Sequence, residues 1–365
     1  MGHRADKSFF EKKRAWSKRK DTILEYYLEA YLPKVRRLNR PVLLVDGFAG
    51  PGQFDDGEPG SPTIICAKAQ AANEKPGPPV RVLCIEPEPE LFEKLQHNVA
   101  FPFAESRKGK FLDYVDEIRQ FAQTGTVFLY VDPYTAAEID WAAIDGVSQQ
   151  IRLAKMSVEL LMNFNTFNFV RWGLSALKRQ VPMGDHVEET GETDISIEPP
   201  DHEGLTRVVG GDWWRDVIGA NRPFGQVVED VATRIGAALR ERYAEVCWVP
   251  IKGRRNDNVP KYHMFFGSRH PDALELMNDA MVKARGASDF QIDLFAEDDV
   301  DQMVLNLAPD WVPRGELILR VIREAFCRYY RKDIRGRIES LLKGGRLVSE
   351  TGKVRINDVV RVKRS

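Results

Sequence analysis

The stretch VDGFAGPGQFDDGEPGSP, residues 45–62, follows the apolar run PVLLV and gives the strongest indication of fold in this chain. It contains five glycines and three prolines. An apolar run that ends in glycines predicts a buried strand followed by a loop whose backbone can approach a ligand, because glycine lacks a Cβ and allows positive φ. Ser61 and Pro62 predict the N-cap and the first position of a helix.

Apolar runs alternate with amphipathic stretches after this loop. Strands are expected at 41–46, 80–86, 109–115, 127–132 and 157–165, with helical stretches between them. Such alternation predicts an α/β fold with a parallel, doubly wound sheet. The runs 247–253 and 261–269 are too close together for a helical crossover and predict an antiparallel pair. The expected architecture is therefore a seven-stranded, Rossmann-like sheet whose last strand is antiparallel, as in S-adenosylmethionine (SAM) methyltransferases.

Composition indicates a globular protein with an ample core. The chain has 365 residues, of which 43% are hydrophobic and 29% charged. No apolar run approaches the ~20 residues of a membrane helix, and the N-terminus has no apolar signal core. Four cysteines are scattered without a CxxC pair, which favours buried thiols in the reducing cytoplasm and no metal site.

Charge divides the chain into segments. Residues 1–40 hold 12 Lys and Arg against 5 Asp and Glu, and residues 331–365 hold 11 against 4. We expect a basic helical arm at 1–40, a SAM methyltransferase-like domain at 41–285 with an acidic insertion at 182–205, and a basic winged-helix-like unit at 311–365. The last of these should end in a hairpin that turns at Glu350-Thr-Gly352. Basic ends on an acidic body suggest contact with a polyanion, although solvated helix faces give the same pattern.

The glycine loop indicates the type of cofactor. Read from Gly50, it lacks the third glycine of GxGxxG, and no GxxxxGK[ST] motif is present, so dinucleotides and nucleoside triphosphates are not favoured. SAM has no phosphate and needs close approach of the backbone together with an acid for the ribose. The expected contacts are Asp46, Gly47, Phe48, Gly50 and Gly52 in the loop, Glu86 at the ribose and Asp113 at the adenine edge.

Asp132, Pro133 and Tyr134 end the fourth predicted strand and are the expected catalytic residues. In SAM enzymes that methylate exocyclic amines, an acid or amide followed by two prolines and an aromatic residue occupies this place. Here an acceptor, a rigid turn and a ring are present with one proline fewer. A strand-end turn with a packed tyrosine is the alternative.

Basic residues in two places suggest contact with nucleic acid. Lys252, Arg254 and Arg255 lie in the loop between the last two predicted strands and could bind phosphate. Arg335 and Arg337 on the second helix of the basic unit, with Lys353 near the hairpin, suit a duplex backbone. A basic surface loop and a protein-docking module are the respective alternatives.

The motifs together resemble the three-Cys-motif partner protein family. The resemblance is carried by Asp46-Gly-Phe-Ala-Gly-Pro-Gly52, Gly57-Glu-Pro-Gly-Ser-Pro62, Glu86 and Asp132-Pro133-Tyr134, and by the later blocks 210–215 and 262–270. It implies a Rossmann-type methyltransferase relative that associates with a separate protein bearing three cysteines. Thr135 stands where the family tends to have glycine. Two functions follow as expectations: a SAM-dependent methyltransferase acting on nucleic acid or on a substrate presented by a partner, or a non-catalytic adaptor with a methyltransferase-like body.

Overall fold

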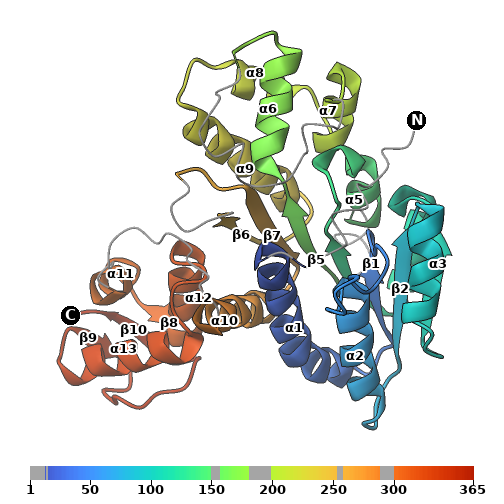
Figure 1. Cartoon of the computed structure of the whole chain (residues 1–365). Coiled ribbons are helices and arrows are strands. Elements are labelled where there is room, and N and C mark those ends of the chain that lie inside the picture. The colour runs from blue at the N-terminus through green and yellow to red at the C-terminus, as the bar shows by residue number, and fades with distance from the viewer. Residues whose placement is uncertain (1–12, 14, 149–156, 181–198, 253–257, 288–299) are drawn as a thin grey trace. The chain divides into compact units, whose positions relative to one another are not determined.

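The structure is a computed structural model that describes residues 13, 15–148, 157–180, 199–252, 258–287 and 300–365. The chain forms two compact units, one ending at His270 and one beginning at Pro271 (Figure 1). The division falls at the start of helix α10 (Pro271–Ala287) and not at residue 285, because α10 packs against α12 (Arg314–Glu324) and α13 (Arg331–Lys343).

A seven-stranded sheet with the order β3-β2-β1-β4-β5-β7-β6 forms the centre of the first unit. Strand β7 runs antiparallel to both of its neighbours, and the other pairs are parallel. The predicted doubly wound, Rossmann-like methyltransferase sheet is therefore confirmed. Its strands are β1 (Val42–Asp46), β2 (Val80–Glu86), β3 (Ala104–Lys108), β4 (Thr126–Val131), β5 (Ser157–Phe164), β6 (Glu245–Ile251) and β7 (Tyr262–Ser268).

The third strand does not lie at 109–115, where the sequence predicted it. Strand β3 has the sequence AESRK and none of its side chains is buried, so it carries no hydrophobic pattern. It lies at the edge of the sheet, where one side of the strand faces solvent. The apolar run that was taken for the strand is instead the 3₁₀ helix η3 (Phe111–Tyr114), followed by α4 (Val115–Ala122).

Helix α1 (Ala15–Val35) packs on one face of the sheet as an integral part of the first unit. Its Tyr27 ring lies 5.4 Å from Phe128 of β4 and 5.5 Å from Phe266 of β7, measured between centroids. Helix α2 (Ser61–Asn73) lies beside α1, as Figure 1 shows. The expected basic arm is thus a sheet-covering helix from Ala15 onward. Residues 1–12 and 14 lie outside the described residues.

The opposite face of the sheet carries a second, extensive apolar core. Alternate side chains of β4, such as Val127 and Leu129, join a buried cluster with Ile118 of α4 and Val231 of α9. Figure 1 shows α6 and α9 on the other side of the sheet from α1. The remaining helices of the unit are α3 (Pro89–Asn98), α5 (Trp141–Ser148), α6 (Thr166–Ala176), α7 (His202–Val209), α8 (Trp213–Gly219) and α9 (Phe224–Arg240). Most of the expected acidic insertion, residues 181–198, lies outside the described residues.

A carboxyl group lies inside the α1 face of the sheet. Glu159 of β5 is buried and accepts a hydrogen bond from the hydroxyl of Tyr27. Burial raises the pKa of Glu159 from 4.5 to about 7. Because folding raises this pKa, its stabilising contribution is fully present below pH 4.5 and is lost as the pH rises towards 7.

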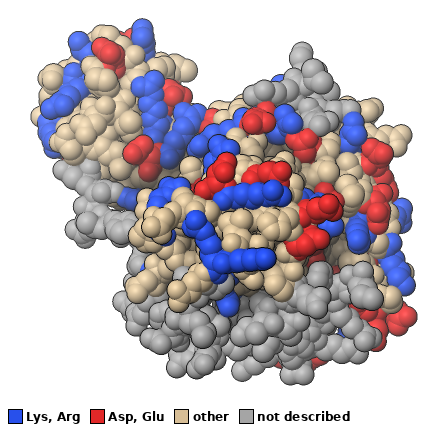
Figure 2. Space-filling view, turned by 90° about the horizontal axis from the view of Figure 1, so that it is seen from above, with Lys and Arg blue, Asp and Glu red and all other residues tan. Residues whose placement is uncertain are grey.

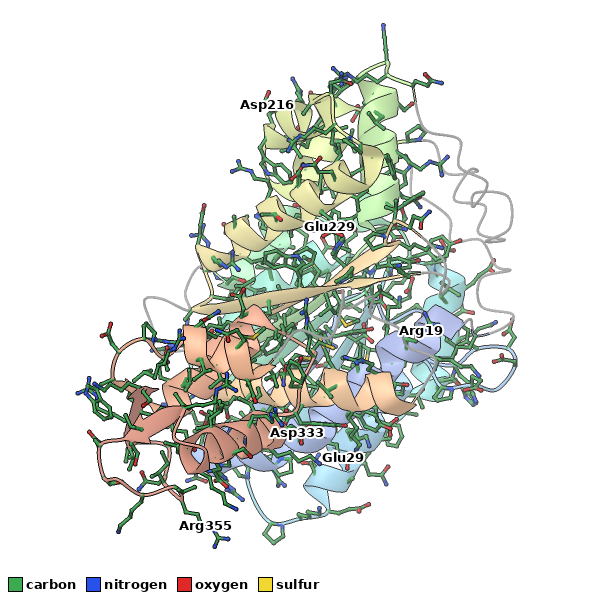
Figure 3. All side chains as sticks on the ribbon, turned by 90° about the vertical axis from the view of Figure 1, so that its left-hand side faces the viewer. Arg19, Glu29, Asp216, Glu229, Asp333 and Arg355 are labelled. Carbon is green, nitrogen blue, oxygen red and sulfur yellow. The ribbon has the colours of Figure 1, made fainter. Side chains whose placement is uncertain are left out.

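Glu159→Gln is therefore expected to remove part of the pH dependence of stability. Between pH 5 and pH 8, the wild-type free energy of unfolding should fall by about 2 to 3 kcal/mol more than that of the variant. Chemical denaturation at both pH values measures this difference. Glu29 also belongs to α1, but its side chain is exposed (labelled in Figure 3). Glu29→Gln should therefore leave the pH dependence of the free energy of unfolding as it is in wild type. Equal slopes for wild type and Glu159→Gln would contradict a raised pKa.

The second unit combines helices with a small sheet of order β8-β10-β9. The expected turn at 350–352 is present, since the Gly352 amide donates to the Ser349 carbonyl at 3.0 Å. The return strand, however, begins only at Arg361, because residues 353–360 form a long loop and not a continuous hairpin. The elements not yet given are α11 (Val300–Asn306), β8 (Val312–Pro313), β9 (Leu347–Ser349) and β10 (Arg361–Arg364).

Asp358 fixes this long loop to the helices of the second unit. Its carboxylate lies 2.8 Å from guanidinium nitrogens of both Arg314 and Arg331, and 3.5 Å from Arg335. Arg314 is 1% exposed, which is rare for an arginine. Burial opposes ionisation, but Arg314 holds the pKa of Asp358 below its ordinary value. The loop is therefore held by a buried guanidinium and not by strand pairing.

None of the helices in the described part of the chain combines the length and apolar character that crossing a bilayer requires.

Candidate functional site

A cavity of about 500 Å³ lies at the carboxyl ends of β1, β2 and β4. Ligands of open α/β sheets bind at this edge, because the loops that leave the strands there surround a crevice. The structure brings eight of the ten predicted cofactor and catalytic residues to the cavity wall. These are Gly47, Phe48, Gly50, Gly52, Glu86, Asp132, Pro133 and Tyr134.

The glycine loop after β1 forms the middle of the cavity wall. Gly50 and Gly52 have φ values of +59° and +81°, in the left-handed region that residues with a Cβ rarely adopt. The Gly52 carbonyl accepts from the Gly60 amide at 2.8 Å and from the Thr63 hydroxyl at 2.6 Å. The loop is thus turned back onto the start of α2, and its glycines present bare backbone to the cavity.

Asp46 shapes this loop and is not part of the cavity wall, contrary to its predicted contact with the cofactor. It is fully buried, accepts from the Ser61 hydroxyl at 2.7 Å and from the Phe48 amide at 3.2 Å. Burial raises its pKa to about 7. Ser61 was predicted as the N-cap of α2, but Gly60 is the N-cap, because the Ser61 hydroxyl is used to bind Asp46.

Glu86 lies at the end of β2 on the other side of the loop. Its carboxylate accepts from the Gly50 amide at 2.9 Å and from the Glu88 amide at 2.8 Å, one on each oxygen. Burial raises its pKa to about 6. An ionised carboxylate has about four lone-pair sites, so two acceptor sites remain for hydroxyl groups in the cavity.

Asp113 does not reach the cavity, which corrects its predicted place at the adenine edge. It lies in η3, and its carboxylate accepts from the Lys110 amide at 2.8 Å. Phe111 and Leu112 of the same helix line the cavity instead, and the Phe111 ring lies 6.3 Å from that of Phe48. Sequence reasoning missed this apolar wall because it interpreted the run around Phe111 as a strand.

Asp132 lies beside Asn163, because the pairing of β4 with β5 sets Val131 opposite Met162. The Asn163 amide nitrogen donates to Asp132 Oδ1 at 3.0 Å, and the Tyr130 hydroxyl donates to Oδ2 at 3.0 Å. The turn that follows is fixed by Thr135, which caps the 3₁₀ helix η4 (Ala136–Glu138) by accepting from the Ala137 amide. This capping role explains why threonine is found at position 135.

Helix α1 supplies a wall that sequence reasoning missed. The cavity is lined on this side by Ser17, Lys20 and Asp21, which come before β1 and the glycine loop in the sequence. The Lys20 ammonium lies 2.7 Å from Asp132 Oδ1, and the Lys13 ammonium lies 2.6 Å from Asp21. Burial raises the pKa of Asp21 to about 6. The sequence signal was only the presence of Lys13, Lys20 and Asp21 among the apolar positions of the arm, and their burial is visible only in the structure.

The residues predicted to contact nucleic acid are dispersed. Arg254 and Arg255 lie outside the described residues, and the Lys252 carbonyl accepts from Arg19 of α1, labelled in Figure 3. Arg337 forms two hydrogen bonds of 2.7 Å with Asp301, and Arg335 pairs with Asp358. Lys353 is exposed on the long loop of the second unit.

Surface charge is mixed on the face shown in Figure 2, where Lys and Arg alternate with Asp and Glu among the described residues. The part of the chain that the structure describes contains no group of three or more His, Cys, Asp or Glu that could hold a metal ion. Among the described residues, the predicted cofactor and catalytic residues therefore gather at the cavity, and the predicted nucleic-acid contacts do not gather at one place.

No family model and no curated protein matches this sequence. Among solved structures, the chain is similar to the plantazolicin methyltransferase BamL in complex with a triazolic desmethylPZN analogue and S-adenosylhomocysteine (SAH). The identity is 12% over 72% of this chain and 90% of that one, with a TM-score of 0.35. It is also similar to human methyltransferase-like protein 13 in complex with SAH, at 11% identity over 78% and 98% of the two chains and a TM-score of 0.36. No residue role is transferred from either protein.

Proposed function

We propose that this chain binds SAM in the cavity and acts as a SAM-dependent methyltransferase. The observation that carries the proposal is the composition of the cavity wall. The glycine loop lies between Glu86, which has acceptor sites left for a ligand, and the turn of Asp132, Pro133 and Tyr134. When bound, SAM supplies an electrophilic methyl group on a sulfonium.

The residues present fit SAM without a phosphate-binding element. Glu86 would accept the ribose hydroxyls with its two remaining acceptor sites, and Phe111 with Leu112 would cover the adenine. The loop at Gly47, Gly50 and Gly52 would take the methionine portion against bare backbone. Asp132, Pro133 and Tyr134 would face the methyl acceptor. The chain's own contribution is to align the two reactants and to exclude water.

The acceptor is proposed to be a nucleic acid or a substrate presented by a partner, for which the family resemblance suggests a protein with three cysteines. The excess of basic residues at 331–365 supports a polyanion. Figure 3 shows Arg355 projecting from the long loop of the second unit. The four cysteines of this chain are buried and free, in keeping with a cytoplasmic protein and with a cysteine cluster supplied by another chain.

Titration calorimetry with SAM tests the proposal. Saturable binding of one SAM per chain is the expected result, and methyl transfer from labelled SAM should then be found in one of three pools: total RNA, DNA or lysate protein. Absence of binding at millimolar SAM would remove the methyltransferase proposal altogether.

A non-catalytic adaptor is the second candidate, and the Lys20–Asp132 ion pair favours it. This contact occupies the carboxylate that the acceptor would otherwise face. An adaptor predicts that SAM binds with equal affinity to wild type and Asp132→Ala, and that no pool becomes labelled. Labelling that disappears in Asp132→Ala would exclude the adaptor.

A further inference from the structure

We propose that Asp132, held by Asn163, and the ring of Tyr262 form a binding subsite for an alkylammonium group, which Lys20 fills in this structure and which the amino group of the acceptor takes in its place. The proposal deepens the proposed function, since it rests on the same cavity and names the chemical class of the acceptor as an aliphatic primary amine.

The Lys20 ammonium makes the contacts of a bound cation. It lies 2.7 Å from Asp132 Oδ1, and its side chain is 8% exposed. It also lies 5.4 Å from the centre of the Tyr262 ring, within the range of a cation–π interaction. Tyr262 and Asp132 both line the cavity, so a ligand there can reach the same carboxylate and the same ring.

A buried acceptor atom beside this ion pair has no partner. Asn163 is 2% exposed and donates its amide nitrogen to Asp132, but its Oδ1 has no hydrogen-bond partner among the described residues. Buried polar atoms are rarely left unpaired, because desolvation without a new hydrogen bond costs free energy. The Lys20 ammonium does not pair with this atom, and Asn163 is not among the residues that line the cavity, so Asn163 acts on the subsite through the hydrogen bond that holds Asp132.

The chemistry of the subsite selects a cation over a neutral aryl amine. The Asp132 carboxylate and the face of the Tyr262 ring both attract positive charge, and neither is a hydrogen-bond donor to an anion. A protonated alkylamine in the place of the Lys20 ammonium meets both, whereas a nucleobase amino group carries no charge. Because Lys20 occupies this subsite, a primary ammonium on an alkyl chain fits it.

For methyl transfer the bound ammonium would first give a proton to the Asp132 carboxylate. The freed nitrogen lone pair would then form the bond to the methyl carbon as the carbon–sulfur bond breaks, which leaves a neutral thioether.

Lys20 reaches the subsite from a segment held by the buried Lys13–Asp21 ion pair and by contacts with the segment after the glycine loop. The first turn of α1 is joined to the segment after the glycine loop through Lys18, 2.6 Å from Glu58, and Lys13, which precedes the helix, lies 2.5 Å from the Pro59 carbonyl. The Lys18–Glu58 pair is solvent-exposed, and such pairs contribute little to stability. Release of Lys20 therefore requires the first turns of α1 to move while the rest of the helix stays packed on the sheet.

The test uses the full chain and n-butylammonium chloride, which reproduces the lysine side chain. Lys20→Ala should lower the midpoint of thermal unfolding, and n-butylammonium should restore at least half of the loss by binding the folded state. n-Butanol, which lacks the charge, should restore none of it, and NaCl at equal ionic strength controls for screening. Lys18→Ala leaves the subsite filled by Lys20, so n-butylammonium should raise its unfolding midpoint much less than that of Lys20→Ala, because the probe must first displace Lys20.

Asp132→Asn in the Lys20→Ala background should abolish the response, since the carboxylate is the main contact of the cation. If Lys20→Ala does not fold, Lys20→Met keeps the stem and is tested with methylammonium. A folded variant that does not respond to the ammonium probe, or that responds equally to butanol, overturns the subsite. Restoration by aniline, an aryl amine that is neutral at pH 7, in place of n-butylammonium overturns the aliphatic class.

Displacement of Lys20 is tested on the wild-type chain by amide hydrogen exchange. Saturating n-butylammonium should increase exchange within residues 15–24 at least about threefold over NaCl, because the first turns of α1 lose a contact. If the exchange rate does not change, n-butylammonium does not displace Lys20 from the subsite, and this part of the proposal is wrong. Calorimetry with SAM separates this proposal from the broader function: SAM binding without an ammonium response leaves a methyltransferase with another acceptor, and the reverse leaves an ammonium-binding protein.

Discussion

Gly50→Val is expected to reduce the affinity for SAM by about 100-fold or more, while the chain remains folded. Gly50 has a φ of +59°, and a β-branched residue is strongly disfavoured in that region. Its amide also donates to Glu86 at 2.9 Å, so a change of backbone conformation displaces the carboxylate assigned to the ribose. Titration calorimetry measures the loss, and circular dichroism verifies the fold.

Gly57→Ala is the matched control for this substitution. Gly57 belongs to the same segment and has a φ of +85°, but a Cβ there would meet nothing within 4 Å and the residue does not line the cavity. SAM affinity should stay within about threefold of wild type. If Gly50→Val binds SAM equally well, the glycine loop is not the SAM site.

Asp358→Ala is expected to destabilise the second unit by about 3 to 5 kcal/mol, because it leaves the buried Arg314 guanidinium without its closest carboxylate. Glu339, at 3.5 Å from Arg314, compensates only in part. The long loop at 353–360 should also lose its attachment to α12 and α13, which hydrogen exchange in this loop would report. Thermal unfolding of the full chain measures the loss as an earlier transition.

Asp333→Ala provides the control within the same unit. Asp333 is exposed in the first turn of α13 and is labelled in Figure 3. Its removal costs only a favourable interaction with the helix dipole, about 0.5 kcal/mol. Equal unfolding midpoints for Asp358→Ala and wild type would show that Arg314 does not depend on Asp358.

The parallel strands could be located from the sequence because they are buried on both faces. Strands β1, β2, β4 and β5 therefore read as nearly continuous apolar runs with sharp ends. Strand β3 could not be located, since its edge position allows a polar sequence, while the helix after it offers a misleading apolar one.

The site was predictable only where its residues end strands. Glu86 and Asp132 follow apolar runs whose carboxyl ends meet at one edge, so their presence at the cavity could be expected. Asp46 ends a strand too, but its side chain is used to hold Ser61. Whether a strand-end carboxylate lines the cavity depends on the direction that it faces. Glu86 and Asp132 face the cavity, whereas Asp46 faces the start of α2, where Ser61 lies.

The sequence by itself determined strands β1, β2, β4 and β5, the antiparallel last pair and the glycine loop, because these depend on residue spacing and on the backbone freedom of glycine. Only the tertiary structure decided what surrounds Asp132. Lys20 lies 112 positions away in the sequence and Asn163 lies 31 away, and each reaches the carboxylate through the packing of α1 and β5. Local patterns carry no information on such contacts, since they arise when separate elements bury their apolar faces against one sheet.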